Sequence, residues 1–274
     1  MNQAAPHRPT PAATGEIALA VASNNPAILR ANLMASPALA GSLGPVHVER
    51  DAPSAPVAYN RALDATTAPY VVFAHHDVYL PRGWDSLLRA RIAEVAAHDP
   101  DWALLGAYGR GLDGGCEGPV WSTSIGHVVG RVALNPVPVQ SFDELLIVMR
   151  RDAGLRFDEA LPGFHLFGTD IVQAARAAGR GAYAVALPLI HNDGYHEQLD
   201  GQFAAAYRHL QAKWRDRLPL VTPVTSISRH GLHLMRSRWH NFRTRAYRQS
   251  MAQPTDTAPA LWAARCGWSD LTPR

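Results

Sequence analysis

Hydrophobic residues along this 274-residue chain form two kinds of pattern, which alternate in order. Short apolar runs rich in Val, Ile and Ala predict buried strands, and apolar positions recurring every three or four residues predict amphipathic helices. This alternation is typical of a mostly parallel sheet flanked by helices, with right-handed crossovers between its strands. The predicted strands are residues 16–22, 46–48, 70–74, 102–107, 144–151 and 182–187, and the predicted helices are residues 27–35, 58–66, 84–97, 170–178 and 199–214.

The strand at residues 70–74 ends on three polar side chains that can bind a metal, His75, His76 and Asp77. Its sequence, YVVFA, is apolar throughout, which predicts burial on both faces of a sheet. Ligands of open α/β sheets bind at the carboxyl ends of the strands. We therefore expect the three residues to line the floor of a crevice. A turn capped by Asp77, with both histidines bonded to backbone carbonyls, explains the same pattern without a site.

Two later residues, Asp170 and His191, are further candidates for a site. The stretch LPGFHLFGTD leads into a helix for which Thr169 is a suitable N-cap, and Asp170 then lies in the first turn. An acid at this position also complements the helix dipole, so it has a structural explanation as well as a catalytic one. His191 follows the last predicted strand, where it is either a ligand or part of a turn.

Length and composition predict one large α/β domain with appendages. No apolar run approaches the roughly 20 residues of a membrane-spanning helix, and Cys116 and Cys266 lack the spacing of a zinc site or a disulfide framework. The Pro- and Ala-rich start lacks the apolar core of a signal peptide, so we expect a cytoplasmic protein. The expected organisation is a disordered leader (1–15), an α/β domain (16–198), a basic helical extension (199–250) and a tail (251–274).

The formal net charge of +3 conceals a strongly basic segment. Residues 206–250 contain ten Lys or Arg and one acid, which gives +9 and leaves −6 for the rest of the chain. This asymmetry indicates an anionic partner for the segment. Residues 229–248 also contain Leu, Trp and Phe, so their interpretations are a solvated helix face and a helix on the anionic inner face of a membrane. We expect no nucleic-acid partner, because no recognised binding motif accompanies the charge.

Several motifs together resemble the glycosyltransferase-like proteins related to inverting family 2, which have the GT-A fold. They span roughly residues 16–195 and comprise Ser23-Asn24-Asn25, Tyr59-Asn60-x-Ala62, His75-His76-Asp77-Val78, and residues 157–170 with His191 downstream. The resemblance implies transfer of a sugar, with inversion, from a nucleoside diphosphate donor to a hydroxyl group. It also implies that residues 16–198 are the catalytic domain and that the acceptor is a cell-surface glycan or a lipid-linked saccharide.

The resemblance assigns roles to individual residues. Asp77 matches the final acid of the Asp-x-Asp motif, which binds the cation and the donor diphosphate, whereas His75 replaces the first acid. Imidazole suits Mn²⁺ better than Mg²⁺, so Mn²⁺ is the favoured cofactor, with His191 as a further ligand. Asp170 matches the catalytic base. The donor nucleotide is expected to contact Ser23, Asn24, Glu49, Asn60, His75, His76 and Asp77.

Four residues are candidates for the acceptor side of the site. Asp143 and Glu144 form an acidic pair that supplies the base if Asp170 does not. Trp121 follows a glycine-rich stretch and can stack on a sugar ring, and His165 lies between two apolar residues. Core or rim packing is the commoner explanation of such a tryptophan and of such a histidine.

Two other functions compete with glycosyl transfer. A zinc-dependent hydrolase would use His75, Asp77 and His191 to hold a metal and activate water. A protein that kept the fold but lost the first acid would bind nucleotides or glycans without catalysis. The transferase hypothesis requires that Asp77 and Asp170, which are far apart in the sequence, face one cleft from opposite sides.

Overall fold

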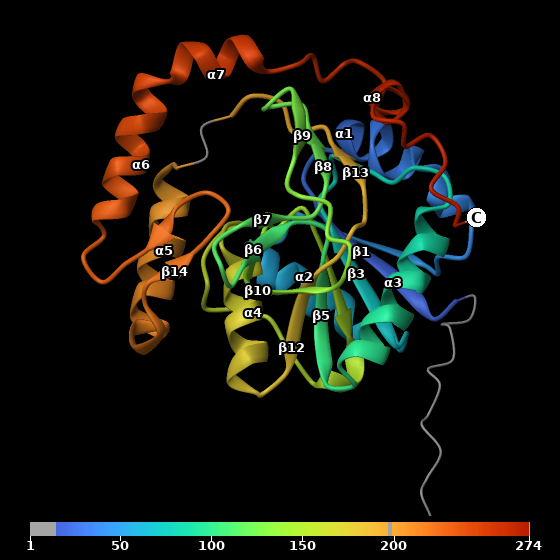
Figure 1. The fold of residues 1–274 in the computed structure, drawn as a ribbon, viewed down its shortest axis with the longest axis horizontal. Coiled ribbons are helices and arrows are strands. Elements are labelled where there is room, and N and C mark those ends of the chain that lie inside the picture. Colours follow the sequence, from blue (N-terminus) through green and yellow to red (C-terminus); the bar gives the residue numbers. More distant parts are fainter. Residues whose placement is uncertain (1–14, 197–198, 274) are drawn as a thin grey trace, which may run out of the picture.

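The computed structural model describes residues 15–196 and 199–273, so residues 1–14 of the predicted leader lie outside the described part of the chain. Its centre is a nine-stranded sheet with the order β2-β1-β3-β11-β5-β12-β10-β6-β7 (Figure 1). The strands are β1 (Ile17–Ser23), β2 (Val46–Arg50), β3 (Tyr70–Ala74), β5 (Trp102–Gly106), β6 (Gly109–Gly111), β7 (Cys116–Glu117), β10 (Val137–Phe142), β11 (Leu146–Arg150) and β12 (Gly181–Ala184).

Most strands of this sheet run in one direction, as the alternation of strands and helices predicts. β1 is parallel to both β2 and β3, and β5 is parallel to β12. β11 lies between β3 and β5 and is antiparallel to both. A parallel strand needs a long crossover, usually a helix, before it, whereas β11 follows the short hairpin strands β6 to β10. The apolar pattern of β11 therefore predicts its burial but not its direction.

A second sheet brings the end of one strand beside Asp77. Its order is β4-β13-β8-β9, and His191 of β13 pairs with Val78 of β4. The backbone N–H of Asn192 also donates to the carbonyl of Asp77, at 2.9 Å. These strands are β4 (Val78–Tyr79), β8 (Val120–Ser122), β9 (His127–Val129) and β13 (Leu189–His191), and a separate two-stranded sheet contains β14 (Leu220–Val221) and β15 (Ser226–Ile227).

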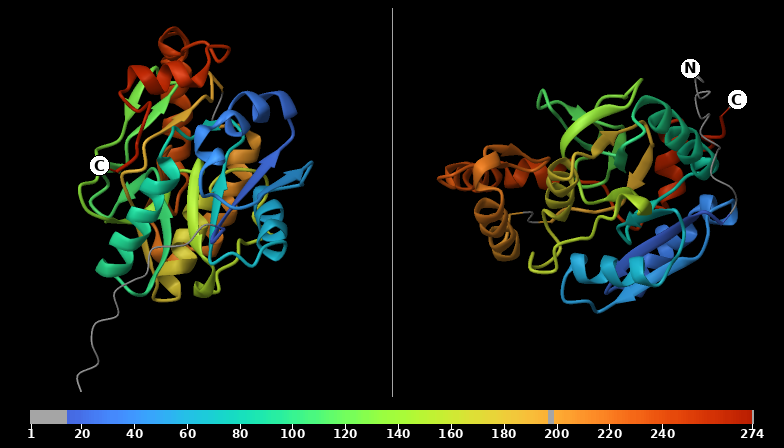
Figure 2. Two further views of the ribbon diagram at one scale, coloured as in Figure 1. Left: turned by 90° about the vertical axis from the view of Figure 1, so that its right-hand side faces the viewer. Right: turned by 90° about the horizontal axis from the view of Figure 1, so that it is seen from below.

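Helices cover both faces of the central sheet (Figure 2). Alternate strand residues point to opposite faces, so Ala20 packs in a core with α2, α4 and α5, whereas Leu19 packs in another with α1 and α3. The helices are α1 (Pro26–Ala31), α2 (Ala55–Asp64), α3 (Trp84–His98), α4 (Phe167–Ala177), α5 (Gly201–Lys213), α6 (Leu232–Arg243), α7 (Arg245–Met251) and α8 (Pro259–Arg265). Short 3₁₀ turns occupy Leu33–Ala35, Pro37–Ala40, Arg151–Ala153 and Arg215–Arg217.

The start of α4 differs from the prediction. The helix begins at Phe167 instead of Asp170, and its N-cap is Leu166, whose φ of +64° lies in the left-handed region. Thr169 therefore lies within the first turn and does not cap the helix. Leu166 and Phe167 are both buried in the core, and this packing fixes where the turn begins. A long-range contact of this kind outweighs the local capping preference of threonine.

The C-terminal part of the chain runs along the rim of the molecule and then returns to it. In Figure 1, α6 and α7 lie on the outer side and α8 lies near β13. α8 buries Trp262 in a small apolar cluster with Tyr79 and Ile190. Within the described residues, no helix combines the length and the apolar character needed to cross a bilayer.

Candidate functional site

A cavity of about 490 Å³ lies at the carboxyl ends of β1, β2 and β3. This is the edge at which open α/β sheets bind ligands. None of its described lining residues is Lys or Arg, and its ionisable lining residues other than Tyr59 and Tyr108 are carboxylic acids and histidines. The described lining therefore offers an anion no lysine or arginine partner. The acids are Glu49, Asp51, Asp77, Asp143, Glu144 and Asp193, and the histidines are His75, His76, His165, His191 and His196.

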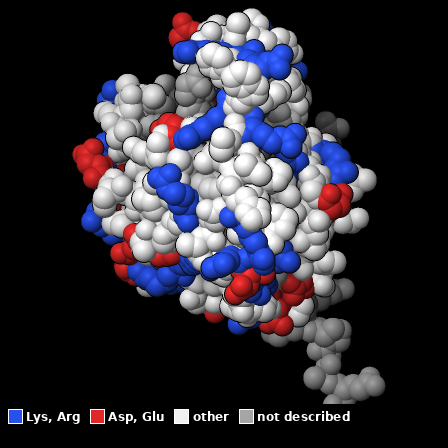
Figure 3. All heavy atoms as spheres, turned by 90° about the vertical axis from the view of Figure 1, so that its left-hand side faces the viewer, with Lys and Arg blue, Asp and Glu red and all other residues white. Residues whose placement is uncertain are grey.

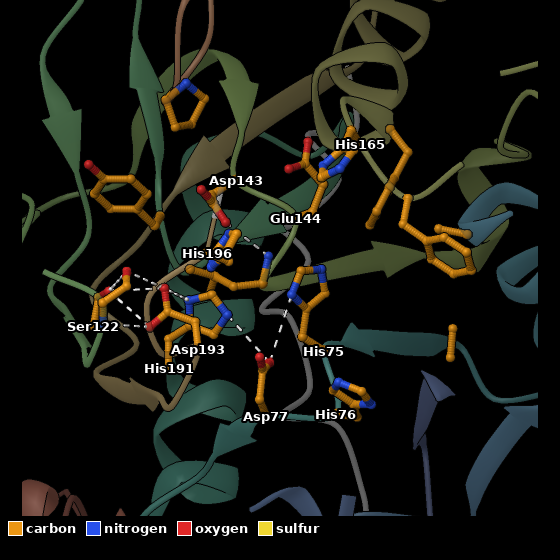
Figure 4. Close-up of a pocket in the computed structure, with 18 of the residues that line it drawn as sticks. His75, His76, Asp77, Ser122, Asp143, Glu144, His165, His191, Asp193 and His196 are labelled. Atoms are coloured by element: carbon orange, nitrogen blue, oxygen red, sulfur yellow. Dashed lines mark hydrogen bonds and ion pairs between the residues drawn. The ribbon is translucent and has the colours of Figure 1, made fainter. Parts of the chain in front are cut away.

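His75, Asp77 and His191 converge in this cavity (Figure 4). One potential ligand atom from each of them lies within 4.8 Å of the other two. Asp77 Oδ1 is 3.4 Å from Nε2 of His191 and 3.9 Å from Nδ1 of His75. The prediction that these residues lie together is confirmed. They meet because His191 of β13 pairs with Val78 of β4, which follows Asp77 directly.

The buried polar atoms of this cluster fit a metal ion. Asp77 Oδ1 and His191 Nε2 are both buried, and neither forms a hydrogen bond with a described residue. Unsatisfied buried polar groups are costly, and a bound cation would coordinate both atoms. Two imidazoles with one carboxylate suit Mn²⁺ or Zn²⁺ better than Mg²⁺, which prefers an all-oxygen shell.

Burial and neighbouring charges shift the ionisation of all three residues. Burial lowers the pKa of His75 to about 4. Burial alone would raise the pKa of Asp77, but His191 and His75 lower it below the usual value of a carboxyl group. Burial would lower the pKa of His191, whereas Asp193 and Asp77 together raise it to about 10. Without a metal, Asp77 and His191 therefore form an ion pair, and metal binding must displace the proton of His191.

Asp193 forms an ion pair with His191 on the side away from Asp77. Its carboxylate is 3.7 Å from Nδ1 of His191 and accepts hydrogen bonds from the hydroxyls of Ser122 and Thr123 and from the backbone N–H of Ser124. A carboxylate behind a metal-binding histidine sets its tautomer and orientation. This position of Asp193 beside His191 was not predicted from the sequence. The only signal was that Asp193 lies two residues beyond a candidate ligand, while its partners come from a loop about 70 residues earlier.

Asp143 and Glu144 form the acidic pair of the cavity. Both are buried, and burial raises the pKa of each of them. Asp143 adds to the effect on Glu144 by charge repulsion, so the pKa of Glu144 lies well above its usual value. A raised pKa moves the ionisation of a carboxyl group toward neutral pH, which favours its use as an acid or a base.

Some of the residues predicted to contact the donor nucleotide line the cavity, and one of them is buried in the core. Ser23, Asn24, Glu49 and His76 line the cavity, and the hydroxyl of Ser23 lies 2.9 Å from Nδ1 of His76. Asn60 is buried below the cavity and does not line it. Its side chain bonds to the backbone N–H and carbonyl of Phe157 and to Glu159, which fixes the loop before α4. We therefore correct its assignment from donor contact to structural support.

Asp170 does not face the cavity, although the transferase hypothesis required it to share one cleft with Asp77. Its buried carboxylate accepts hydrogen bonds from Nζ of Lys213 at 2.9 Å and from Nε1 of Trp214 at 2.7 Å, both at the end of α5. It is not among the residues that line the cavity with Asp77. Its position in the first turn of α4 is as predicted, but its side chain ties two helices together. Asp170 is thus corrected from catalytic base to structural residue.

The two aromatic candidates for the acceptor side also separate. His165 lines the cavity and lies against the ring of Phe203, at 5.5 Å between ring centroids. Trp121 instead stacks on Trp262 of α8, at 5.1 Å, and is not part of the cavity wall. Trp121 therefore supports the packing of the C-terminal segment, which corrects its predicted role as a sugar platform.

Comparison with known proteins gives a likeness at the level of the fold. No family model matches the chain. A protein of Fuscovulum blasticum described as "ATP synthase subunits region ORF 6" is 32% identical over 152 residues, covering 51% of this chain and 59% of that protein. This chain thus matches less than two thirds of that relative.

Two solved structures are similar to the chain at low sequence identity. GalNAc-T7 with UDP, GalNAc and Mn²⁺ has a TM-score of 0.50 and 10% identity, over 94% of this chain and 55% of that one. The mannosyltransferase PcManGT from Pyrobaculum calidifontis with GDP-Man and Mn²⁺ has a TM-score of 0.41 and 15% identity, over 92% and 76%. The strand order, the cavity at the strand ends and the likeness to GalNAc-T7 show that this chain has the fold of the GT-A-type glycosyltransferases.

Proposed function

We propose that this protein is a metal-dependent glycosyltransferase that moves a sugar from a nucleoside diphosphate to a hydroxyl acceptor with inversion. The observation that carries the proposal is the His75, Asp77 and His191 cluster in a cavity whose described lining contains no Lys or Arg. A diphosphate entering such an acidic cavity needs a cation to offset its charge. Ligands of open α/β sheets bind at this edge, which supports a nucleotide site next to the cluster.

The ligands of the cation are His75, Asp77 and His191, and Mn²⁺ is the favoured ion. Bound there, it would neutralise the negative charge that develops on the leaving diphosphate. Asp193 holds His191 in place, and Ser23, Asn24 and Glu49 supply polar contacts for the nucleotide. The protein's part in this half of the reaction is to bind and orient the donor.

Because Asp170 does not line the cavity, the general base of this proposal is the alternative that the sequence offered, the Asp143–Glu144 pair, and this pair replaces Asp170 as the acid that must share the cleft with Asp77. A base must remove the proton of the acceptor hydroxyl as it attacks the anomeric carbon, and it must therefore lie in the cavity. Both members of the pair do so, and their raised pKa values bring proton exchange closer to neutral pH. Direct attack by the hydroxyl, without a covalent sugar–enzyme intermediate, inverts the anomeric carbon.

The proposed acceptor is a glycan or a lipid-linked saccharide. The proposed location of the enzyme is the cytoplasm. The lining of the cavity is partly apolar, since Phe164, Pro223 and Val224 line it together with His165. Apolar side chains next to a histidine suit the faces and hydroxyls of a sugar ring.

The proposal is tested by binding and by turnover. Thermal unfolding is followed with UDP and GDP, each with and without Mn²⁺, because a ligand at about 100 times its Kd stabilises a protein by about 2.7 kcal/mol. We expect UDP or GDP to stabilise the protein only when Mn²⁺ is present, and by more than Mn²⁺ alone does. Release of UDP or GDP from a panel of nucleotide sugars then measures the reaction. Asp77→Asn should abolish both signals, whereas the exposed control Asp152→Asn should leave them unchanged.

Zinc hydrolysis is the second candidate, because the same cluster also suits Zn²⁺. Metal analysis of protein purified without chelators separates the two functions. One tightly bound zinc per chain, with no stabilisation by any nucleoside diphosphate, would replace the transferase proposal with the hydrolase. Nucleotide-dependent stabilisation without turnover of any donor would instead favour a non-catalytic binding protein.

A further inference from the structure

Helices α6 and α7 form a ridge on the outside of the molecule, residues Leu232–Met251 (Figure 1). One side of α6 is attached to the body: Leu234 is buried in the core, Ser237 bonds to Thr225 at 2.8 Å, and Arg238 donates to the backbone of Leu199. No residue of α7, all of which is described, is buried. The ridge is therefore held in place from one side and open on the other.

The open side of α6 is apolar. At 100° per residue, Leu232, Met235, Trp239 and Phe242 fall on one face, turned away from the face that carries Leu234 and Ser237. They are 57%, 67%, 62% and 70% exposed, and the rings of Trp239 and Phe242 stack at 6.0 Å. Isolated exposed apolar residues are common, but a stripe of four along one helix marks a contact surface.

Arginine side chains border this stripe. Arg236 and Arg243 are exposed and lie at its edge on the helix, and Arg229 is exposed just before the helix begins. The sequence contains no acid between Asp216 and Asp256. In Figure 3, which shows this side of the molecule, Lys and Arg side chains are interleaved with uncharged ones. The surface therefore combines large apolar side chains with positive charge.

We propose that this ridge docks on an anionic lipid bilayer, with α6 lying in the plane of the headgroups. A convex helix with aromatic side chains outward and arginines at the edge can insert its apolar face between lipids while the guanidinium groups contact phosphates. A second copy of the chain is a poorer partner, because symmetric pairing of the ridges would bring arginines against arginines without any acid to offset them.

The docked ridge lies next to the cavity wall. Thr225, which bonds to Ser237 of α6, directly follows Pro223 and Val224, and these two residues line the cavity. Docking thus brings the cavity close to the bilayer, where a lipid-linked acceptor would reside. Membrane binding itself is independent of the proposed function, because it needs neither metal nor nucleotide.

Vesicle co-sedimentation of the full chain tests the proposal. We expect binding to phosphatidylcholine vesicles that contain phosphatidylglycerol, little binding to phosphatidylcholine alone, and loss of binding as salt is raised. The double substitution Arg236→Gln with Arg243→Gln should weaken binding about fivefold for each arginine removed. Trp239→Ser with Phe242→Ser should release the protein from vesicles. The control Leu134→Ser removes a side chain that is 84% exposed outside the ridge and should bind like wild type.

Several results would overturn the proposal. One is equal binding of wild type and both double variants, and another is absence of binding to anionic vesicles. A third is wild-type dimerisation in sedimentation without lipid that Trp239→Ser with Phe242→Ser abolishes, since the ridge would then be an interface between copies. Circular dichroism and nucleotide-dependent stabilisation of each variant show that the rest of the protein is intact. If the protein does not bind vesicles, the proposed glycosyltransferase function is unaffected. If it does not bind nucleotide, the vesicle experiment still tests membrane binding.

Discussion

The raised pKa values of Asp143 and Glu144 make the free energy of folding depend on pH. A carboxyl group whose pKa is higher in the folded than in the unfolded protein binds its proton more tightly when folded. Folding is then less favourable above the ordinary carboxyl pKa of about 4 than below it, and the loss accumulates as pH rises toward the raised value. Both Asp143 and Glu144 are groups of this kind.

Asp143→Asn is therefore expected to stabilise the metal-free protein while impairing the reaction. The amide keeps the oxygen that accepts a hydrogen bond from Leu145 N–H, at 3.2 Å, and removes the charge that opposes ionisation of Glu144. Unfolding temperatures in EDTA should be equal for variant and wild type near pH 4 and higher for the variant at pH 7. Turnover should fall about 10²- to 10⁴-fold. A stability difference that does not change with pH would contradict the assignment.

The sequence predicted the metal cluster but not the residues that support it. His75 and Asp77 follow the apolar run of β3, and His191 ends the apolar run of β13, so local patterns place all three at strand ends. Their convergence depends on the pairing of β13 with β4, which follows Asp77 directly. The hydrogen bonds from Ser122 and Ser124 to Asp193 depend on the pairing of β8 with β13, which no local pattern records. The prediction that Asp170 faces the cavity was wrong for the same reason, since its hydrogen-bond partners lie 43 and 44 residues away, at the end of α5.

At the scale of elements, a charged network connects α5 to α4 and to the loop before it. Lys213 donates to Asp170 and also to Asp158, at 2.7 Å, and Asp158 is 3.0 Å from Nε2 of His209. The Lys213 side chain is 29% exposed and the Asp170 side chain is 3% exposed. Removing the lysine would leave Asp170 buried with Trp214 as its remaining partner.

We expect Lys213→Met to lower the free energy of unfolding by about 2 kcal/mol, the cost of a buried carboxylate that has lost its counter-ion. Urea denaturation measures this. Lys213→Arg is the matched control and should retain most of the stability. Asp170→Asn should also destabilise the protein, yet the folded fraction should turn over at the wild-type rate. A loss of turnover by 10²-fold or more in folded Asp170→Asn would restore this residue as the base and displace the Asp143–Glu144 pair.

Element types were easier to predict than their boundaries and directions. The apolar runs at β1, β3 and β5 indicated buried strands, and the structure confirms them. The start of α4 depends on the packing of Leu166 and Phe167, and the antiparallel direction of β11 depends on the hairpins before it. Both are decided by tertiary contacts, which sequence periodicity does not contain.

At the scale of the whole molecule, the C-terminal segment braces the strands that carry the metal cluster. Trp262 of α8 packs with Tyr79 and Ile190 and stacks on Trp121 of β8. Tyr79 lies two residues after Asp77, and Ile190 directly precedes His191. The backbone N–H of Gln253 also donates to the carbonyl of Thr123, at 2.7 Å. The segment from Gln253 to α8 thus packs against the strands next to Asp77 and His191. The sequence did not predict this support.

Trp262→Ala should therefore weaken both folding and metal binding. Truncation of a buried tryptophan costs about 3–5 kcal/mol, and the void would lie directly behind β4 and β13, whose ends hold Asp77 and His191. We expect weaker binding of Mn²⁺, measured by calorimetry at a temperature where the variant is folded. Leu261→Ala is the matched control, since the neighbouring side chain on α8 is 58% exposed and its loss should change stability by about 0.5 kcal/mol or less. If Trp262→Ala is destabilised but binds Mn²⁺ as tightly as wild type, the ligand geometry is set by the strand pairing alone, and α8 contributes only to stability.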